Sequence, residues 1–541
     1  MPSLIALLTR SSTFAPFQTV VFRRLWLAAF AANIAMWMND VTAAWVMTSL
    51  TTSPVMVAMV QTASTLPVFL LGLPSGALAD IIDRRRYFAA TQLWVALIAL
   101  VLSVLALTDA LTAPLLLGLT FANGIGMAMR WPVFSAIVPE VVPREHLGAA
   151  MALNGISMNL SRVVGPVVAG AILSIMGSGV VFVLNTLLAV VAFVTILRWR
   201  SQPTTSTLPG ERFVGAMRVG WQHAMQSNRM RSVLVRIFFY FLQSSAVLAL
   251  LPLIARNIHG AGPTTYTLML ASIGAGAVFA AMNFPRWRQR FNRDQFVLIG
   301  TLTHAAMSVV VVFVPNIWVA LPAIAVLGMA WISTANSVTL AAQVALPNWV
   351  RARGMAIYQM ALMGGAAAGS LLWGQVASLS NVRIAVACAA VVGPTLLFLT
   401  RRLSVEGGAD PDFSPAKTGD LPQVAIEVAP DEGPVMVTVE YQIDLADAKS
   451  FAEVMEKTRR ARLRQGVLSW GLFRDTAAPG RYIEYFVDES WVEHLRRLER
   501  FTNADAGLRE VRLSFHRGEK PPRVQRFVAE GLHIGMPLPK R

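Results

Sequence analysis

The chain has 541 residues, of which 55% are hydrophobic and only 14% are charged, and its mean hydropathy is +0.55. This composition excludes a water-soluble fold of this length and indicates a multi-span membrane protein. The net charge of +16 comes from arginines between the apolar runs, where membrane topology and lipid headgroups explain them, so no nucleic-acid partner is expected. The single cysteine, Cys388, excludes an internal disulfide and a thiolate metal cluster, and no metal or other cofactor is expected.

Twelve apolar segments of bilayer length follow along the chain in two sets of six. Residues 1–24 have neither a separate short apolar core nor a cleavage site, so we expect no cleavable signal peptide. The first set covers residues 25–49, 54–79, 87–108, 113–138, 147–175 and 179–198, and the second covers residues 233–257, 264–284, 295–315, 317–342, 353–378 and 382–400. We therefore predict an all-α membrane protein with twelve transmembrane helices.

Arginines mark one side of this predicted membrane domain. They cluster in the connections at residues 84–86, 286–290 and 351–353, whereas the connections on the opposite side offer only Arg256 and Arg383. By the positive-inside rule, both termini are expected in the cytoplasm.

The two sets of spans repeat with a constant shift of 204 residues, from the second to the fifth span of each set. Matching pairs include Gly72 and Gly276, Arg84 and Arg288, Gly124 and Gly328, Gly165 and Gly369, and Gly170 and Gly374. The repeat predicts an N-terminal six-helix half (1–198) and a C-terminal six-helix half (232–403), with substrate between them near the bilayer midplane. Asp80 maps to Phe284, so the second half lacks the acidic residue of the first basic loop.

Residues 199–231 form a polar, basic cytoplasmic linker between the halves. Phe213, Met217, Trp221 and Met225 recur every four residues, which predicts an amphipathic helix on the inner membrane surface. We interpret this segment as a tether and not as a binding site.

Asp40 is an ionisable residue at bilayer depth, where insertion scales give a cost of about 3 kcal/mol. It lies in the outer half of the first span, and Asn33 and Trp37 precede it on the same helical face. A lone carboxylate there suits a proton-coupling group that exchanges its proton when substrate binds. A permanently charged partner for an arginine explains Asp40 equally well, and the sequence leaves both interpretations open.

Arg130 in the fourth span and Arg162 in the fifth are the main buried cations. A guanidinium stays charged, so it pairs with a carboxylate, caps carbonyls or attracts an anionic substrate. Asn154, Ser157 and Ser161 recur at helical spacing beside Arg162 and predict a polar stripe. The residues expected to line the substrate cavity are Asn33, Trp37, Arg130, Arg162, Asn336 and Gln359. A purely structural role for the two arginines is the alternative.

The segment GALADIIDRRR, residues 76–86, resembles the Gly-x-x-x-Asp-x-x-Gly-Arg-Lys loop signature of the major facilitator superfamily. The matching positions are occupied by Gly76, Asp80, Arg84 and Arg85. Ile81 and Asp83 depart from the signature, which has a basic residue and a second glycine there. The resemblance implies a cytoplasmic gate, in which Asp80 faces the start of the eleventh span and Arg84 pairs with Glu140.

Two further stretches narrow this resemblance. Gly165, Pro166 and Gly170 resemble the fifth-span Gly-Pro-x-x-Gly-Gly signature of the antiporter branch, with Ala169 in place of one glycine. Such a helix seals the cavity and re-packs when the halves rock. MNDVTAAWVMTSLTTSPVMVAMVQ, residues 38–61, is typical of the branch that contains the enterobactin exporter and related effector-secretion permeases.

The resemblance implies a proton-coupled secondary active transporter in the bacterial inner membrane. Its partners would be the lipid bilayer, protons and a small amphipathic substrate, such as a siderophore or a drug-like compound, exported by alternating access. No phosphate-binding GxxxxGK[ST] loop occurs, so ATP-driven transport is not expected. The alternatives are an importer of the same fold and a membrane-anchored sensor or enzyme that acts through the C-terminal region.

The composition changes after Arg402, where a flexible linker (404–434) rich in Pro, Gly, Asp and Glu begins. A strand at 435–442, a helix at 446–463, strands at 467–475 and 481–487, and helices at 490–500 and 503–511 are predicted next. They indicate a small cytoplasmic α+β ferredoxin-like domain (435–520), followed by a tail (521–541). The stretches GVLSWGLFRD and DESWVEHLRR resemble antibiotic-biosynthesis-monooxygenase-like domains.

Four residues of this domain are candidates for catalysis, namely Trp470, Trp491, His494 and His516. They form neither a metal-ligand spacing nor a nucleophile–base set, so we expect no enzyme activity. A regulatory, docking or dimerising role is favoured, with a homodimer through this domain as one form.

Overall fold

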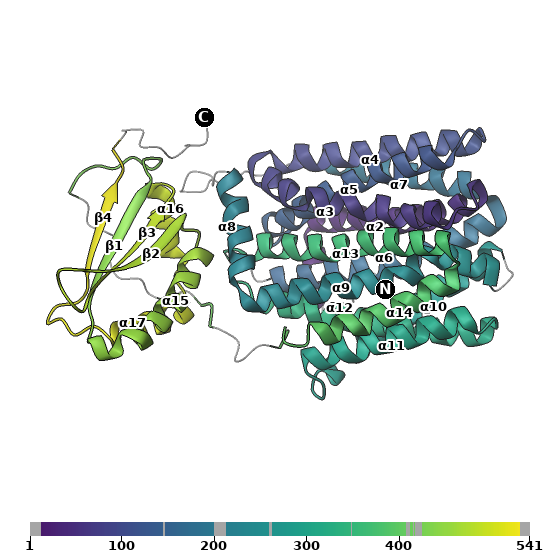
Figure 1. Cartoon of the computed structure of the whole chain (residues 1–541). Coiled ribbons are helices and arrows are strands. Elements are labelled where there is room, and N and C mark those ends of the chain that lie inside the picture. The colour runs from purple at the N-terminus through teal and green to yellow at the C-terminus, as the bar shows by residue number, and fades with distance from the viewer. Residues whose placement is uncertain are drawn as a thin grey trace. The chain divides into compact units, whose positions relative to one another are not determined.

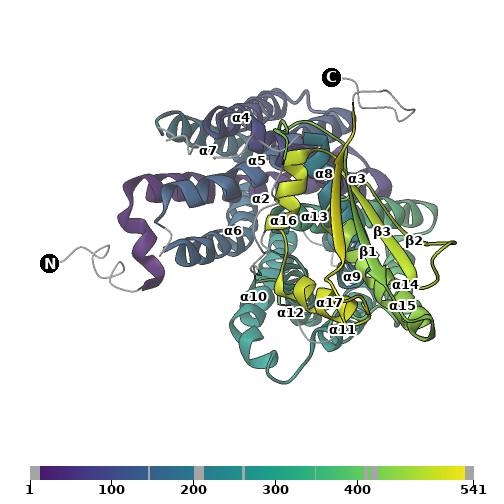
Figure 2. The same cartoon turned by 90° about the vertical axis from the view of Figure 1, so that its left-hand side faces the viewer.

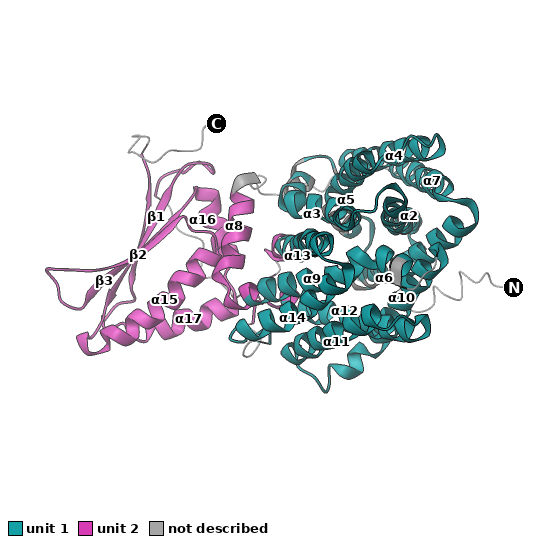
Figure 3. Ribbon diagram, turned by 45° about the vertical axis from the view of Figure 1, so that its right-hand side comes forward, with its two compact units in different colours: residues 1–213, 232–341, 356–406 teal, residues 214–231, 342–355, 407–541 magenta. Residues whose placement is uncertain are grey.

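The computed structural model describes residues 12–143, 146–199, 213–258, 262–347, 349–406, 412–414, 416 and 425–530 (Figure 1). The chain divides into two compact units (Figure 3). The first combines residues 1–213, 232–341 and 356–406, and the second combines residues 214–231, 342–355 and 407–541. The second unit therefore contains three segments that lie far apart in the sequence.

Long apolar helices make up the first unit. They are α2 (Val20–Leu50), α3 (Pro54–Ile81), α4 (Arg84–Leu107), α5 (Ala113–Val141), α6 (Leu147–Met176), α7 (Ser178–Leu197), α9 (Asn228–Leu253), α10 (Pro263–Trp287), α11 (Arg293–Phe313), α12 (Ile317–Val344), α13 (Arg351–Leu379) and α14 (Val382–Leu399). Within the described residues, eleven of these helices are long and apolar enough to cross a membrane, and α5 is a further helix of 29 residues. The expectation of a mostly helical multi-span protein is confirmed.

Capping residues set the ends of several helices. The carboxylate of Asp83 accepts a hydrogen bond from the backbone N–H of Arg86 at 2.8 Å and so begins α4. Asn292 and Gln295 form a reciprocal capping box at the start of α11. Pro54 lies in the first turn of α3, where its missing N–H costs nothing. These residues divide the apolar sequence into separate helices.

Glycines that match between the two sequence halves pack against matching helices. A Cβ atom on Gly165 of α6 would lie 2.5 Å from Cβ of Trp37 on α2. A Cβ on its counterpart Gly369 of α13 would lie 2.3 Å from the carbonyl oxygen of Leu242 on α9. In each half, the fifth helix thus approaches the first helix through a glycine.

A four-stranded sheet forms the C-terminal part of the second unit. The strands β1 (Val435–Gln442), β2 (Ser469–Arg474), β3 (Arg481–Asp488) and β4 (Arg523–Val528) lie in the order β2-β3-β1-β4. All neighbouring strands are antiparallel. The helices α15 (Ala448–Arg464), α16 (Trp491–Glu499) and α17 (Asn503–Leu513) cover one face of the sheet (Figures 1 and 2). The expected small α+β domain is present, and β4 extends the sheet beyond residue 520.

Alternation along β1 builds the core of this domain. Val435, Val437, Val439 and Tyr441 are buried at every second position. They pack with Phe451 of α15 and other apolar residues between the sheet and the helices. The second unit also contains residues 342–355 and most of α8 (Phe213–Gln226), a helix of the linker between the halves.

Candidate functional site

Asn33 and Arg130 form a buried polar pair in the N-terminal half. Arg130 Nη2 donates a hydrogen bond to Asn33 Oδ1 at 2.6 Å, which joins α5 to α2. A pocket beside this pair is lined by Gln92 of α4 and Asn154 of α6, together with apolar side chains. Gln92 is 1% exposed, and its side-chain oxygen and nitrogen contact no hydrogen-bond partner in the described part of the chain. The pocket therefore offers unsatisfied polar groups inside an apolar bundle.

Arg162 lies between two tryptophan rings that come from different halves of the sequence. Its Cζ atom is 5.2 Å from the ring centroid of Trp37 on α2 and 4.6 Å from that of Trp331 on α12. Among the described residues, no hydrogen-bond partner contacts Arg162 Nε, Trp37 Nε1 or Trp331 Nε1. Three buried N–H donors from three helices are thus free to bind an acceptor.

Sequence reasoning did not find Trp331. It lies inside the apolar run of the tenth span, where a tryptophan is ordinary, and its repeat counterpart is Met127. Only the packing of α6 and α12 in three dimensions shows that it contacts Arg162. Its position, five residues before the predicted cavity residue Asn336, is the one available sequence signal.

Asp40 is half-buried one turn beyond Trp37 on α2. Among the described residues, no hydrogen bond or ion pair of its carboxylate is found. Further along α2, Trp45 stacks on Tyr266 of α10 with ring centroids 5.5 Å apart. The carboxylate therefore lies on the same helix as Trp37, and no described arginine pairs with it.

The structure gives fewer side-chain contacts for the other residues predicted to form the cavity and the gate. Asn336 on α12 and Gln359 on α13 are both half-buried. Arg85 donates a hydrogen bond to the carbonyl of Leu197 at the end of α7. The side chains of Gly76, Asp80, Arg84 and Glu140 lie outside the part that the structure describes, so the gate stays a prediction.

Small residues join the two halves along α6 and α10. A Cβ atom on Gly170 would lie only 1.8 Å from Oγ1 of Thr267, and one on Gly274 would lie 3.2 Å from Val163. On the opposite side, Gly374 of α13 approaches Ala58 of α3 in the same way, at 2.5 Å. Glycines thus bring α6 close to α10 and α13 close to α3.

Under the transport function that the sequence resemblance implies, replacing Gly170 with alanine should slow transport strongly. The added methyl group overlaps Thr267, and overpacking of this kind costs about 1–3 kcal/mol, or roughly tenfold in the population of the packed arrangement. The rate of substrate transport per folded protein in liposomes measures the effect. The double variant Gly170→Ala/Thr267→Gly should recover the rate, because all three close atoms belong to Thr267.

Gly118 is the matched control for this substitution, because a Cβ atom there meets nothing within 4 Å. Gly118→Ala should leave the rate unchanged. A Gly170→Ala protein with wild-type transport would contradict the importance of the α6–α10 contact.

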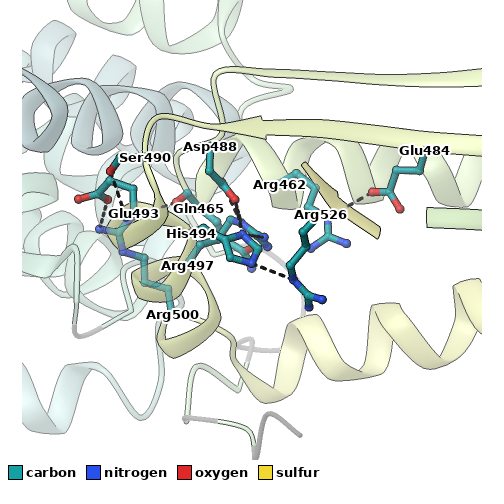
Figure 4. A network of polar contacts seen from close by, with 10 residues as sticks. All are labelled: Arg462, Gln465, Glu484, Asp488, Ser490, Glu493, His494, Arg497, Arg500 and Arg526. Atoms are coloured by element: carbon teal, nitrogen blue, oxygen red, sulfur yellow. Dashed lines mark hydrogen bonds and ion pairs between the residues drawn. The ribbon is translucent and has the colours of Figure 1, made fainter. Parts of the chain in front are cut away.

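A buried network of charges stabilises the C-terminal domain (Figure 4). Glu484 is fully buried and accepts hydrogen bonds from Tyr441, Trp470 and Arg462. Burial alone would raise the pKa of Glu484, but the charges of Arg462 and Arg512 outweigh it and hold the pKa below its ordinary value. The carboxylate is therefore a permanent structural charge.

The four candidate catalytic residues of this domain have structural partners. Trp470 donates to Glu484 at 3.0 Å, and Trp491 stacks on His494. His494 contacts Asp488 at 2.8 Å and accepts from Arg526 at 3.1 Å. Both ring nitrogens of His516 are hydrogen-bonded to main-chain atoms. Within the described residues, no group of three His, Cys, Asp or Glu side chains is placed to hold a metal.

The long apolar helices of the first unit are those of a multi-pass membrane protein. The family model of the transmembrane secretion effectors matches residues 11–532. The chain belongs to this family, which is of the major facilitator type.

The curated relatives that match this chain have low sequence identity to it. Macrolide efflux protein A of Streptococcus pyogenes is 22% identical over 263 residues, which are 48% of this chain and 65% of that protein. The staphyloferrin A transporter of Staphylococcus aureus is 20% identical over 262 residues, with the same two coverages. The chain thus spans less than two thirds of the length of these relatives.

Solved structures show the same fold. A bacterial homologue of the human lysosomal transporter Spinster has a TM-score of 0.58 at 13% identity, covering 72% of this chain and 98% of that one. The nucleoside transporter NupG has a TM-score of 0.56 at 11% identity, covering 71% of this chain and 98% of that one. The identities are too low for these structures to indicate a substrate.

Proposed function

We propose that the protein exports a small amphipathic molecule rich in hydrogen-bond acceptors, such as a siderophore or a macrolide-like compound, in exchange for protons. The observation that carries this proposal is the Arg162 sandwich, in which Arg162 lies over the rings of Trp37 and Trp331. Its three N–H donors, Arg162 Nε, Trp37 Nε1 and Trp331 Nε1, have no hydrogen-bond partner among the residues that the structure describes. A guanidinium binds carboxylate, catecholate or polyhydroxylated groups, and the two indole N–H groups are further donors for the same acceptors. The names of the efflux and siderophore relatives agree with this class.

Asp40 is assigned the proton-coupling role in this mechanism. It lies on the same helix as Trp37, so protonation and substrate binding act on one element. Substrate contact with Arg162 and proton exchange at Asp40 would alternate as the halves rock along α6–α10 and α3–α13. Gly165, Pro166 and Gly170 are the sealing residues of α6 in this scheme, and Asn33, Arg130, Asn336 and Gln359 complete the cavity.

The proposed topology has twelve spans in two six-helix repeats with both termini in the cytoplasm. The length of α5 and the matching glycine contacts of Gly165 and Gly369 support the count and the repeat. The side chains at Gly76, Asp80, Arg84, Arg85 and Glu140 would then form the cytoplasmic gate of a bacterial inner-membrane protein.

Substrate-dependent proton movement in proteoliposomes tests this function. A pH gradient is imposed, and catecholate siderophores, macrolides and lipophilic cations are added in turn. Proton movement with one acceptor-rich class supports the exporter, and movement in the reverse sense would identify an importer. No response from folded, oriented protein to any compound would contradict the proposal.

A homodimer through the C-terminal domain is a further part of this proposal. The sheet face opposite the helices exposes apolar side chains, namely Met436 (39% exposed), Phe473 (60%) and Phe527 (44%). Exposed apolar patches of this kind mark interaction sites in soluble domains. The mass of the complex in detergent, with and without Phe473→Asp, measures the association.

A further inference from the structure

The helix α8 presents one face to the C-terminal domain. Arg218 Nη2 donates to Glu489 Oε2 at 2.6 Å, just before α16, and the two side chains are 31% and 20% exposed. Val219 fits against Gly466, where a Cβ atom would lie 2.7 Å away. Gly466 has φ +104°, a conformation that also favours glycine at this position.

His223 extends this contact by one helical turn. Its Nδ1 atom lies 3.3 Å from the carbonyl oxygen of Arg464 at the end of α15. Its ring meets Trp349 edge-on, with centroids 5.5 Å apart. Arg500, at the end of α16, lies over Trp349 with its Cζ atom 4.9 Å from the ring centroid. The domain thus contacts both α8 and the connection between α12 and α13.

The apolar face that the sequence predicts for α8 is not the one used here. Trp221 is 50% exposed, whereas Val219 is 3% and His223 is 4% exposed. Residues two apart point to opposite sides of a helix. One side of α8 is therefore covered within the second unit, and the side with Trp221 stays available for the membrane surface that the sequence predicts.

We propose that the C-terminal domain is a regulatory clamp, which binds α8 and residues 342–355 on one surface and thereby restrains the cytoplasmic ends of α9, α12 and α13. This inference rests on the proposed transport function. The restraint on these three helices is transmitted through covalent connections. Only Ser227 separates α8 from α9, and residues 345–350 connect α12 to α13. A clamp on these segments opposes any change in the spacing of the three helix ends during alternating access.

The chemistry of the contact suits a reversible clamp. It consists of one partly exposed ion pair, one histidine, two ring contacts and a glycine, and a partly exposed ion pair contributes little to stability. The buried charges behind it are fixed, because Arg500 also donates to the carbonyl of Gln465 and to Glu493 (Figure 4). A rigid surface with weak contacts opens and closes without unfolding the domain.

Charge reversal in the full-length protein tests the clamp. Arg218→Glu and Glu489→Arg should each release α8 and raise the transport rate about fivefold, because both leave like charges in contact. The double variant restores the pair with reversed polarity and should return the rate to within about twofold of wild type. Spin labels at Trp221→Cys and Ser450→Cys, in a Cys388→Ser background, report release as a broadened distance distribution.

Matched controls reverse the same charges on the exposed side of α15. Lys457→Glu and Glu453→Arg should change neither the label distances nor the rate, since both positions are exposed. Release of α8 without a change in rate, or failure of the double variant to restore both readouts, would overturn the clamp. If the wild type transports no tested compound, the proposed function fails, while the label distances still test the docking.

Acidification provides a second test through His223. Burial and the charge of Arg464 lower its pKa from 6.5 to about 4, although the hydrogen bond to the Arg464 carbonyl opposes this. The charge of Arg464 on α15 acts on His223 directly, and two further arginines contact its neighbours, Arg500 at Trp349 and Arg353 at Gly220. The docked state therefore binds fewer protons than the released state.

Docking should accordingly be complete above pH 6.5 and weaken as the pH falls toward 4. Between pH 7.5 and 5 the docking equilibrium should fall by about thirtyfold. In His223→Gln this dependence should disappear, because the glutamine does not titrate. Equal pH dependence of the label distances in both proteins would exclude His223 as the titrating group.

Discussion

Replacing Asp40 with asparagine should reduce gradient-driven efflux to the rate seen without a pH gradient. The amide has the shape of the carboxylate but does not exchange a proton, so substrate movement is no longer linked to proton movement. Exchange of substrate across the membrane without a gradient should continue, because Arg162 and its two rings are unchanged. Paired measurements of gradient-driven efflux and substrate exchange in the same liposomes separate the two effects.

Asp109→Asn is the matched control. Asp109 is an exposed connection residue with φ 54°, a conformation that asparagine also adopts, so the substitution keeps the turn. It should leave gradient-driven efflux unchanged. Wild-type coupling in Asp40→Asn would show that Asp40 has only the structural role that the sequence left open.

Replacing Arg162 with lysine should weaken substrate binding severely although the positive charge remains. A lysine has no planar guanidinium to lie between Trp37 and Trp331, and it has no Nε–H in that plane. A hydrogen bond from a charged donor contributes about 2 kcal/mol, so loss of the Nε–H donor should lower the apparent affinity for an acceptor-rich substrate by roughly thirtyfold. The substrate concentration that gives half-maximal transport measures this change.

Two companion variants make the result specific. Arg383→Lys alters an exposed arginine at the start of α14 and should have no effect. Trp331→Phe keeps a ring but removes one N–H donor, so it should weaken acceptor-rich substrates more than lipophilic cations. An unchanged half-maximal concentration in Arg162→Lys would move the substrate site away from the sandwich, and the Asn33–Arg130 pocket would be the next candidate.

The sequence predicted the positions of helices and strands well where a single hydrophobic pattern determines them. Apolar runs of bilayer length predicted the long helices to within a few residues, because the cost of burying polar groups in lipid sets their lengths. Strand alternation likewise predicted β1 and β3. Asn33 and Trp37 were predicted to share a face with Asp40, and the structure places the first against Arg130 and the second against Arg162.

Contacts between segments that lie far apart in the chain could not be predicted from one sequence alone. Trp331 contacts a residue 169 positions earlier, and nothing in an apolar helix distinguishes it from other tryptophans. The opposite face of α8 was not predicted for the same kind of reason. Val219, Gly220 and His223 contact residues more than 120 positions away along the chain, and local periodicity does not indicate those partners.

The position of β4 has a consequence for the order in which the protein is made. The central strand β1 pairs with β3 on one side and with β4 on the other, and β4 is synthesised after every other strand and after α14. The sheet therefore closes only when the membrane helices have already left the ribosome. The residues of the domain that contact α8, from Arg464 to Glu489, also follow α14 in the chain, so the domain can bind α8 only after the second set of helices has been made.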